Sequence, residues 1–253
     1  MADVKVDALF VKDIFASPDW LKTSYPEIVD ARERMAKLVF SSDGALPLRI
    51  KEIVAVAVLA YRHDPTIETH MRRALAAGAT VREIIEGVMA VCTPGGQPCL
   101  HHSTPPLKIL IEELGAEASR RPAPGTSIKA RTGRENTQGG WPWMEDQYPA
   151  YQQLRRDLNK LMLMPEDASL EPKYREILVA VVLACQSYPT VPHHLRRAVQ
   201  EGATIEEMVE AMQVGALIAG APVFHHASPF IIQIQKDIAA GSLSPAPEVR
   251  ATA

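Results

Sequence analysis

The sequence predicts an all-α fold made of two tandem homologous helical domains that form a pseudo-dimer. The first observation is an internal repeat: residues 52–105 and 176–229, which lie 124 positions apart, are identical at 21 of 54 positions without a gap. Two further observations support this fold: helix-start signals stand at matched positions in the two repeats, and hairpin signals are lacking. Because 124 residues is too long for a solenoid unit, we interpret the repeat as a duplicated domain.

Matched helix-start signals occur in both repeats. A T-x-x-E capping box is formed by Thr80 with Glu83 in the first repeat and by Thr204 with Glu207 in the second. Glycines before the boxes suit the left-handed residue that ends a helix, and prolines suit a first helical turn. These residues are Gly78, Gly202, Pro26 and Pro149.

Two further start signals are expected after paired histidines. Thr104 and Ser228 suit the N-cap position, and each precedes a proline, Pro105 or Pro229, that suits the first turn. These signals predict that helices begin there.

Two β-branched runs, 53–61 and 177–185, favour strands by propensity alone. Because they lie between capped helices with no hairpin signal nearby, we predict that they are buried helices. Each repeat should then contain five or six helices.

The repeat boundaries predict four segments. The first repeat takes residues 1–115 and the second takes residues 143–240. Residues 116–142 are rich in Gly, Pro, Ser and charge, which is typical of a linker crossing the surface. The tail, 241–253, is expected to be disordered.

Composition narrows the classes of function. The chain has 253 residues, 47% of them hydrophobic, and a net charge of −3, which does not favour nucleic acid as a partner. Its longest apolar runs are far shorter than the roughly 20 residues that span a membrane. No secretory signal is evident, and three cysteines without a CxxC pattern are typical of a reduced, cytoplasmic protein.

Each repeat contains the same series of short motifs. A glutamate precedes an apolar run, and H[ML]RRA, GAT and G-x-P follow in that order. This series resembles the carboxymuconolactone decarboxylase and alkyl hydroperoxidase D-like family over most of both repeats. The resemblance implies the all-α alkyl hydroperoxidase D-like fold, and a homo-oligomer with a trimer favoured. The residues that carry it are Glu52, His70, Gly78, Ala79, Thr80, Glu83, Gly96 and Pro98, with Glu176, His194, Gly202, Ala203, Thr204, Glu207, Gly220 and Pro222.

The peroxidase branch of that family has the motif CxxCxxxH. Counting back from His70, the two thiol positions hold His63 and Thr66 here. In the second repeat they hold Ser187 and Thr190. Disulfide exchange needs two neighbouring thiols, so the resemblance does not extend to thiol peroxidase activity. We expect Thr66, Thr190 and His63 to contact the substrate instead.

Six of the eight histidines form matched triplets, although 33 of the 54 aligned positions differ. The triplets are His70, His101 and His102, and His194, His225 and His226. Their retention in both repeats predicts a functional site. The alternative is that each ring caps a helix or satisfies a buried carbonyl.

One use of these triplets is metal binding, since three imidazoles and a water make an open zinc site. However, adjacent residues on a helix point about 100° apart, and no HxxxH or HExxH spacing is present. We therefore prefer chemistry without a cofactor and keep a divalent metal, with His70, His101, His102, His194, His225 and His226 as ligands, as the alternative.

The preferred use is acid–base catalysis, because imidazole titrates near neutral pH. His70 and His194 would donate protons, while Glu52 and Glu176 either orient them or lie at the surface in a first helical turn. The remaining paired histidines would line the site or hold a carboxylate; these are His101, His102, His225 and His226. The pairs Arg72–Arg73 and Arg196–Arg197 are expected on a solvated helix face or in an interface salt bridge.

Together these features predict a carboxymuconolactone decarboxylase-like enzyme. Its substrate would be a small carboxylated lactone or another ring-derived acid, as in the breakdown of aromatic compounds. Two other functions stay open: a metal-dependent hydrolase or lyase, and a non-catalytic binding or assembly protein.

Overall fold

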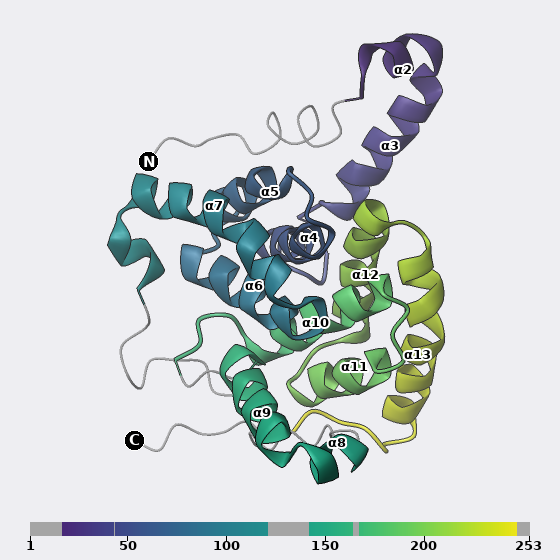
Figure 1. The fold of residues 1–253 in the computed structure, drawn as a ribbon. Helices are drawn as coiled ribbons and strands as arrows, with labels where there is room; N and C mark the ends of the chain where they lie inside the picture. The colour runs from purple at the N-terminus through teal and green to yellow at the C-terminus, as the bar shows by residue number, and fades with distance from the viewer. Residues whose placement is uncertain (1–16, 43, 121–141, 164–166, 247–253) are drawn as a thin grey trace, which may run out of the picture.

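The computed structural model describes residues 17–42, 44–120, 142–163 and 167–246, and twelve α-helices lie within them (Figure 1). The first repeat contains α2 (Asp19–Ser24), α3 (Pro26–Val39), α4 (Leu48–Arg62), α5 (Ile67–Ala76), α6 (Val81–Gly95) and α7 (Gln97–Leu114), followed by a 3-10 turn, η1 (Ala116–Ser119). The second contains α8 (Pro142–Gln147), α9 (Pro149–Leu163), α10 (Pro172–Cys185), α11 (Val191–Gln200), α12 (Ile205–Ala219) and α13 (Pro222–Ala239). The all-α prediction and the expected number of helices are confirmed.

The two β-branched runs are helices, as predicted, and they form the centre of the molecule. Residues 53–60 of α4 and 177–184 of α10 are all buried. Helix α4 packs against α12 of the other repeat, α10 packs against α6, and α4 contacts α10 (Figure 1). The repeats therefore share one hydrophobic core rather than each enclosing its own.

Both capping boxes are present. Thr80 Oγ1 accepts a hydrogen bond from the Glu83 backbone, and Thr204 Oγ1 accepts one from the Glu207 backbone, while each glutamate side chain bonds back to its N-cap N–H. The preceding glycines have positive φ, as expected of residues that end a helix. Local sequence signals thus place α6 and α12 correctly.

The predicted starts at Thr104 and Ser228 are wrong. Helices α7 and α13 begin earlier, at Gln97 and Pro222, where a proline stands in the first turn. Inside the helix, the Thr104 and Ser228 hydroxyls donate to backbone carbonyls four residues back. Hydroxyl side chains can make this bond in a helix interior as well as a cap, so the signal was ambiguous. The histidine pairs consequently lie on helices.

The start of the tail is ordered, contrary to expectation. Leu243 is 7% exposed, and the Ala246 N–H donates to the Gln200 carbonyl at 2.8 Å. Burial of an apolar side chain and a backbone bond to α11 hold this stretch. The rest of the tail and most of the predicted linker lie outside the described residues.

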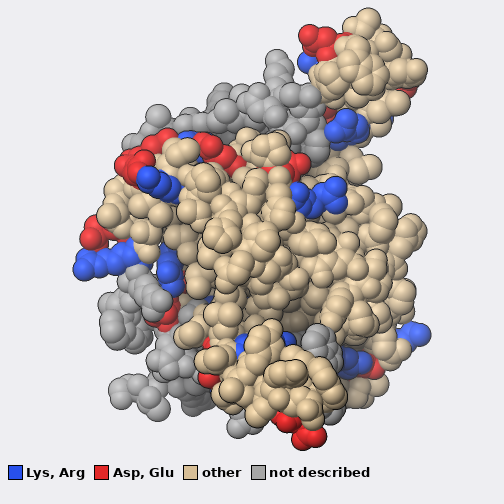
Figure 2. All heavy atoms as spheres, in the orientation of Figure 1, with Lys and Arg blue, Asp and Glu red and all other residues tan. Residues whose placement is uncertain are grey.

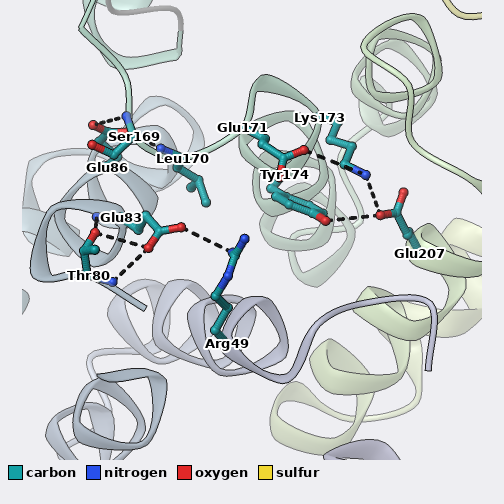
Figure 3. A network of polar contacts seen from close by, with 10 residues as sticks. All are labelled: Arg49, Thr80, Glu83, Glu86, Ser169, Leu170, Glu171, Lys173, Tyr174 and Glu207. Atoms are coloured by element: carbon teal, nitrogen blue, oxygen red, sulfur yellow. Dashed lines mark hydrogen bonds and ion pairs between the residues drawn. The ribbon is translucent and has the colours of Figure 1, made fainter. Parts of the chain in front are cut away.

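A buried carboxylate joins the first repeat to the second. Glu86 on α6 accepts the backbone N–H groups of Ser169 and Leu170, at 2.9 and 2.7 Å, just before α10 (Figure 3). Glu86 is 1% exposed, and an Arg175 nitrogen lies 4.0 Å away. Figure 3 also shows the capping-box glutamates tied to basic residues of α4 and α10.

The reciprocal contact joins the second repeat to the first. Glu210 on α12, which is 124 positions after Glu86, accepts the N–H groups of Ala45 and Leu46 at 2.8 and 3.0 Å. Lys51 Nζ lies 3.1 Å from the same carboxylate. Burial raises the pKa of Glu210, but these backbone bonds and Lys51 outweigh it, so the net pKa lies below its ordinary value.

Surface charge is mixed. In Figure 2 the centre of the face in view is largely uncharged, and both acidic and basic side chains lie around its rim. Among the described residues, no helix is long and apolar enough to cross a membrane.

We expect Glu86→Gln to lower the free energy of unfolding by roughly 2 kcal/mol, because an amide would replace a charged acceptor and turn an N–H₂ group towards backbone N–H donors. Unfolding should stay a single transition, since the core is shared. Urea unfolding followed by circular dichroism measures both quantities. The exposed Glu206→Gln is the matched control, and two separate transitions would contradict the shared core.

Candidate active site

The first site joins α4 to α5 through one carboxylate. Glu52 on α4 accepts the Nδ1–H of His70 on one oxygen, at 2.8 Å, and the Nε–H of Arg73 on the other, at 2.9 Å. His70 and Arg73 are three residues apart and so share the face of α5 that meets α4. Glu52 and His70 are 0% and 1% exposed. A charged group at this depth requires such partners.

The second site repeats this arrangement atom for atom. Glu176 on α10 accepts the Nδ1–H of His194 at 2.7 Å and the Nε–H of Arg197 at 3.0 Å. Glu176 and His194 are also buried. The structure therefore brings together each glutamate and histidine that the sequence analysis selected for acid–base catalysis.

The carboxylate determines which ring nitrogen carries the proton. An ionised carboxylate can only accept, so Nδ1 of the histidine is the protonated nitrogen and Nε2 is the position for proton exchange with a ligand. Burial raises the pKa of Glu176, but the hydrogen bond and charge of His194 and the charge of Arg197 outweigh it. The net pKa of Glu176 is lowered, which favours the ionised form.

The arginines differ from expectation. Side chains of Arg73 and Arg197 are only 10% and 12% exposed and bind the buried glutamates, rather than facing solvent. Their neighbours, Arg72 and Arg196, form salt bridges within the chain, with acidic residues of α7 and α13. The packing of α5 on α4 decides which arginine of the pair is buried. The sequence pattern alone could not predict this choice, because it does not report how the two helices pack.

The second histidine of each pair holds a loop. His102 Nε2 donates to the Asp64 carbonyl at 2.9 Å, and His226 Nε2 donates to the Tyr188 carbonyl at 3.0 Å. The His102 ring also lies 5.6 Å from the His63 ring. These bonds fix the α4–α5 and α10–α11 loops, which immediately precede the helices of the catalytic candidates.

The first histidine of each pair is exposed. His101 and His225 lie on helices α7 and α13, so their rings diverge from those of their neighbours by about 100°. Within the described ranges, no group of three or more His, Cys, Asp or Glu side chains could hold a metal ion. The alternative of three histidines as metal ligands therefore has no cluster to support it.

The residues at the positions that hold the two thiols in the CxxC motif lie in the loops before α5 and α11. Thr66 donates through both its backbone N–H and its hydroxyl to Asp64 Oδ1, at 2.9 and 2.7 Å. Thr66 and Thr190 stand directly before α5 and α11. His63 and Ser187 adopt left-handed backbone, with φ of 53° and 52°. Two matched non-glycine residues in this conformation mark the loop as constrained by its surroundings.

The surroundings of the two sites differ. In the first, the Phe40 ring lies 5.6 Å from the His70 ring. In the second, His193 meets His194 edge-on at 5.2 Å, and burial, followed by the charge of His194, lowers the pKa of His193 to about 4. No sequence signal indicated Phe40, because it lies outside the ungapped part of the repeat.

Comparison with known proteins identifies the family. A sequence profile described as the Carboxymuconolactone decarboxylase family matches residues 26–107 and 149–232, more than half of the chain. The chain belongs to this family. The two matched segments coincide with the two repeats, so the resemblance noted in the sequence is confirmed.

The chain is also similar to a curated protein and to a solved structure. A Paracoccus denitrificans protein named "Uncharacterized protein 4 in cox locus" is 36% identical over 90 residues, which cover 35% of this chain and 80% of that protein. The fold matches a 1.70 Å crystal structure from Burkholderia xenovorans LB400 with a TM-score of 0.57 and 24% identity, over 95% of this chain and 100% of that one. Its assignment as a gamma-carboxymuconolactone decarboxylase subunit is provisional.

We predict that the thiols react slowly in the folded protein. Cys92 and Cys99 are buried, and burial raises the pKa of Cys99 to about 11 and that of Cys185 to about 12. Since the thiolate is the reactive species, Ellman's reagent at mildly alkaline pH should label the native protein slowly and all three cysteines in denaturant. Fast labelling of a native thiol would contradict this and favour redox chemistry.

His193 should remain neutral until the pH falls to about 4. Its pKa in the unfolded chain is about 6.5, so between these pH values the unfolded state takes up the proton first and stability falls as the pH falls. His193→Thr, the residue at the matched position in the first repeat, should reduce the loss of unfolding free energy between neutral and acidic pH. Chemical denaturation measures this, with exposed His225→Thr as the control.

Proposed function

We propose that the protein decarboxylates a small carboxylated lactone, or a related ring-derived acid, by histidine acid–base chemistry. The observation that supports this most strongly is the buried glutamate–histidine–arginine arrangement, present twice with the same atoms in contact. Both repeats retain all three residues of this arrangement, although 33 of their 54 aligned positions differ.

The proposed decarboxylation uses the two ring nitrogens of His70 or His194 in different ways. When the C–CO₂ bond breaks, its electron pair is delocalised towards the lactone carbonyl, and the carbon must then be protonated. Nε2 of His70 or His194, in the imidazolium form, donates that proton, and solvent returns one to the ring. Each turnover thus consumes one proton and releases one CO₂, with no electron transfer.

The buried partners prepare the imidazole for this step. Glu52 binds Nδ1, which keeps the ring in one orientation and stabilises the imidazolium form. Arg73 holds the second oxygen of the same carboxylate, so the carboxylate cannot rotate away. In this proposal His102 and His226 position the adjoining loops, since their Nε2 atoms are bonded to backbone carbonyls.

We expect His70→Asn and His194→Asn each to remove the activity of one site, and the double variant to lose about 10²- to 10⁴-fold in kcat/KM, the usual contribution of a general acid or base. The assay is CO₂ release from a panel of small lactone carboxylates that includes γ-carboxymuconolactone. Exposed Lys108→Gln serves as the control.

A double variant with the wild-type rate would overturn the role of the histidines. If the wild type releases no CO₂ from any member of the panel, the proposed substrate class is wrong. Activity that is lost on chelation and restored by a divalent metal would favour the metal-dependent lyase instead.

A further inference from the structure

The second site contains a half-buried imidazole that the proposed proton transfer does not use. His193, in the first turn of α11, lies beside His194, with the ring centroids 5.2 Å apart and the ring planes at 84°. His194 is buried, whereas His193 is partly open to solvent. A ring in this place meets both the candidate proton donor and a ligand that reaches the donor from solvent.

The ring nitrogens of His193 are available to such a ligand. Across the part of the chain that the structure describes, neither of them has a hydrogen-bond partner. Neighbouring imidazoles are bonded: His194 to Glu176, and His226 to the Tyr188 carbonyl. A polar group that is partly removed from water costs free energy unless water or a ligand bonds to it. An unpaired imidazole next to the candidate donor therefore favours a role in binding.

His193 meets the ligand as a neutral group near pH 7. Burial, followed by the charge of His194, lowers the pKa of His193 to about 4. A neutral imidazole has one N–H donor and one nitrogen acceptor, which together match a hydroxyl group. It lacks the positive charge that strengthens a hydrogen bond to a carboxylate. The complementary group on the ligand is therefore a hydroxyl rather than a second carboxylate.

The contacts of His194 define where that hydroxyl would lie. Glu176 occupies Nδ1 of His194, so the reacting carbon has to approach Nε2. Because the two ring centroids are only 5.2 Å apart, a substituent on the atom next to the reacting carbon comes within reach of His193. The hydroxyl that His193 could bind is thus adjacent to the carbon that loses CO₂.

The first site offers a different neighbour. Thr69 stands at the position that matches His193, and its hydroxyl, carried on the β-carbon, reaches less far from the helix than an imidazole does. The ring beside His70 is that of Phe40, at 5.6 Å. A phenyl ring packs well against an apolar substituent, but it leaves a hydroxyl without a partner.

We propose that His193 is a specificity-determining residue of the second site, which hydrogen-bonds a hydroxyl group that the ligand carries next to its reacting carbon. The first site, with Phe40 beside its donor, prefers a ligand with an apolar group at the same place. The inference rests on the proposed function, from which it takes the position of the ligand at His70 and His194.

The test measures binding rather than turnover. Its probes are two saturated γ-butyrolactone-γ-carboxylates, one with a hydroxyl and one with a methyl group on the β-carbon. Their γ-carbon is not conjugated with the carbonyl, so neither probe loses CO₂ by the proposed route. The full chain is labelled with isotope-enriched histidine, and NMR titration follows the ring signals of His70 and His194. These signals give a separate dissociation constant for each site in the same sample.

The second site should bind the hydroxylated probe about three- to tenfold more tightly than the methylated one, the usual gain from one hydrogen bond. The first site should prefer the methylated probe. His193→Leu should remove the preference of the second site, whereas His193→Asn, which keeps a donor and an acceptor, should retain most of it. Thr69→His should shift the first site towards the hydroxylated probe.

Exposed His225→Leu is the control and should leave both preferences unchanged. Equal binding of the two probes at the second site, or a preference that survives His193→Leu, would overturn the role of His193. If neither probe shifts the His70 or His194 signals, the assignment of both ligand sites is wrong as well. Discrimination as expected, in a protein that releases no CO₂ from any lactone, would support this inference and reject the decarboxylation alone.

Discussion

A carboxylate buried in the core is the constraint on which the sites depend. Glu52 has no contact with solvent, and a charge in that environment is tolerated only when its oxygens are paired. His70 and Arg73 supply the pairing, and both come from α5, so the hydrogen bonds set how α5 lies on α4. The same requirement acts on α10 and α11. The position of each candidate proton donor is therefore a consequence of neutralising a buried charge.

Each site also depends on the other repeat. Helix α4, which carries Glu52, packs against α12, and α10, which carries Glu176, packs against α6. The carboxylates of Glu86 and Glu210 reach across in opposite directions and hold the chain just ahead of α10 and α4. Duplication has thus produced one body with two sites, in which either half completes the packing behind the other's glutamate.

Local chemistry explains which parts could be predicted from the sequence. Capping boxes and apolar runs depend on neighbouring residues only, so α4, α6, α10 and α12 were predictable. The glutamate–histidine pairing was also accessible, because the repeat retained both residues at an 18-residue spacing. The position of the histidine pairs within helices could not be predicted, because Thr104 suits either an N-cap or a helix interior. Burial of Arg73 and the position of Phe40 depend on contacts between helices, which no local pattern reports.

The repeats keep one acid–base arrangement but place it in different surroundings. Phe40 lies against His70, whereas the matched position in the second repeat is Leu163, and a second imidazole, His193, meets His194 there. Burial keeps the pKa of His193 low, so this neighbour is neutral near pH 7 and offers a polar contact without adding charge. A phenyl ring offers only apolar surface. Because the candidate proton donor is the same while its neighbour changes from apolar to polar, we expect the repeats to differ in the ligands they prefer more than in the chemistry proposed for them.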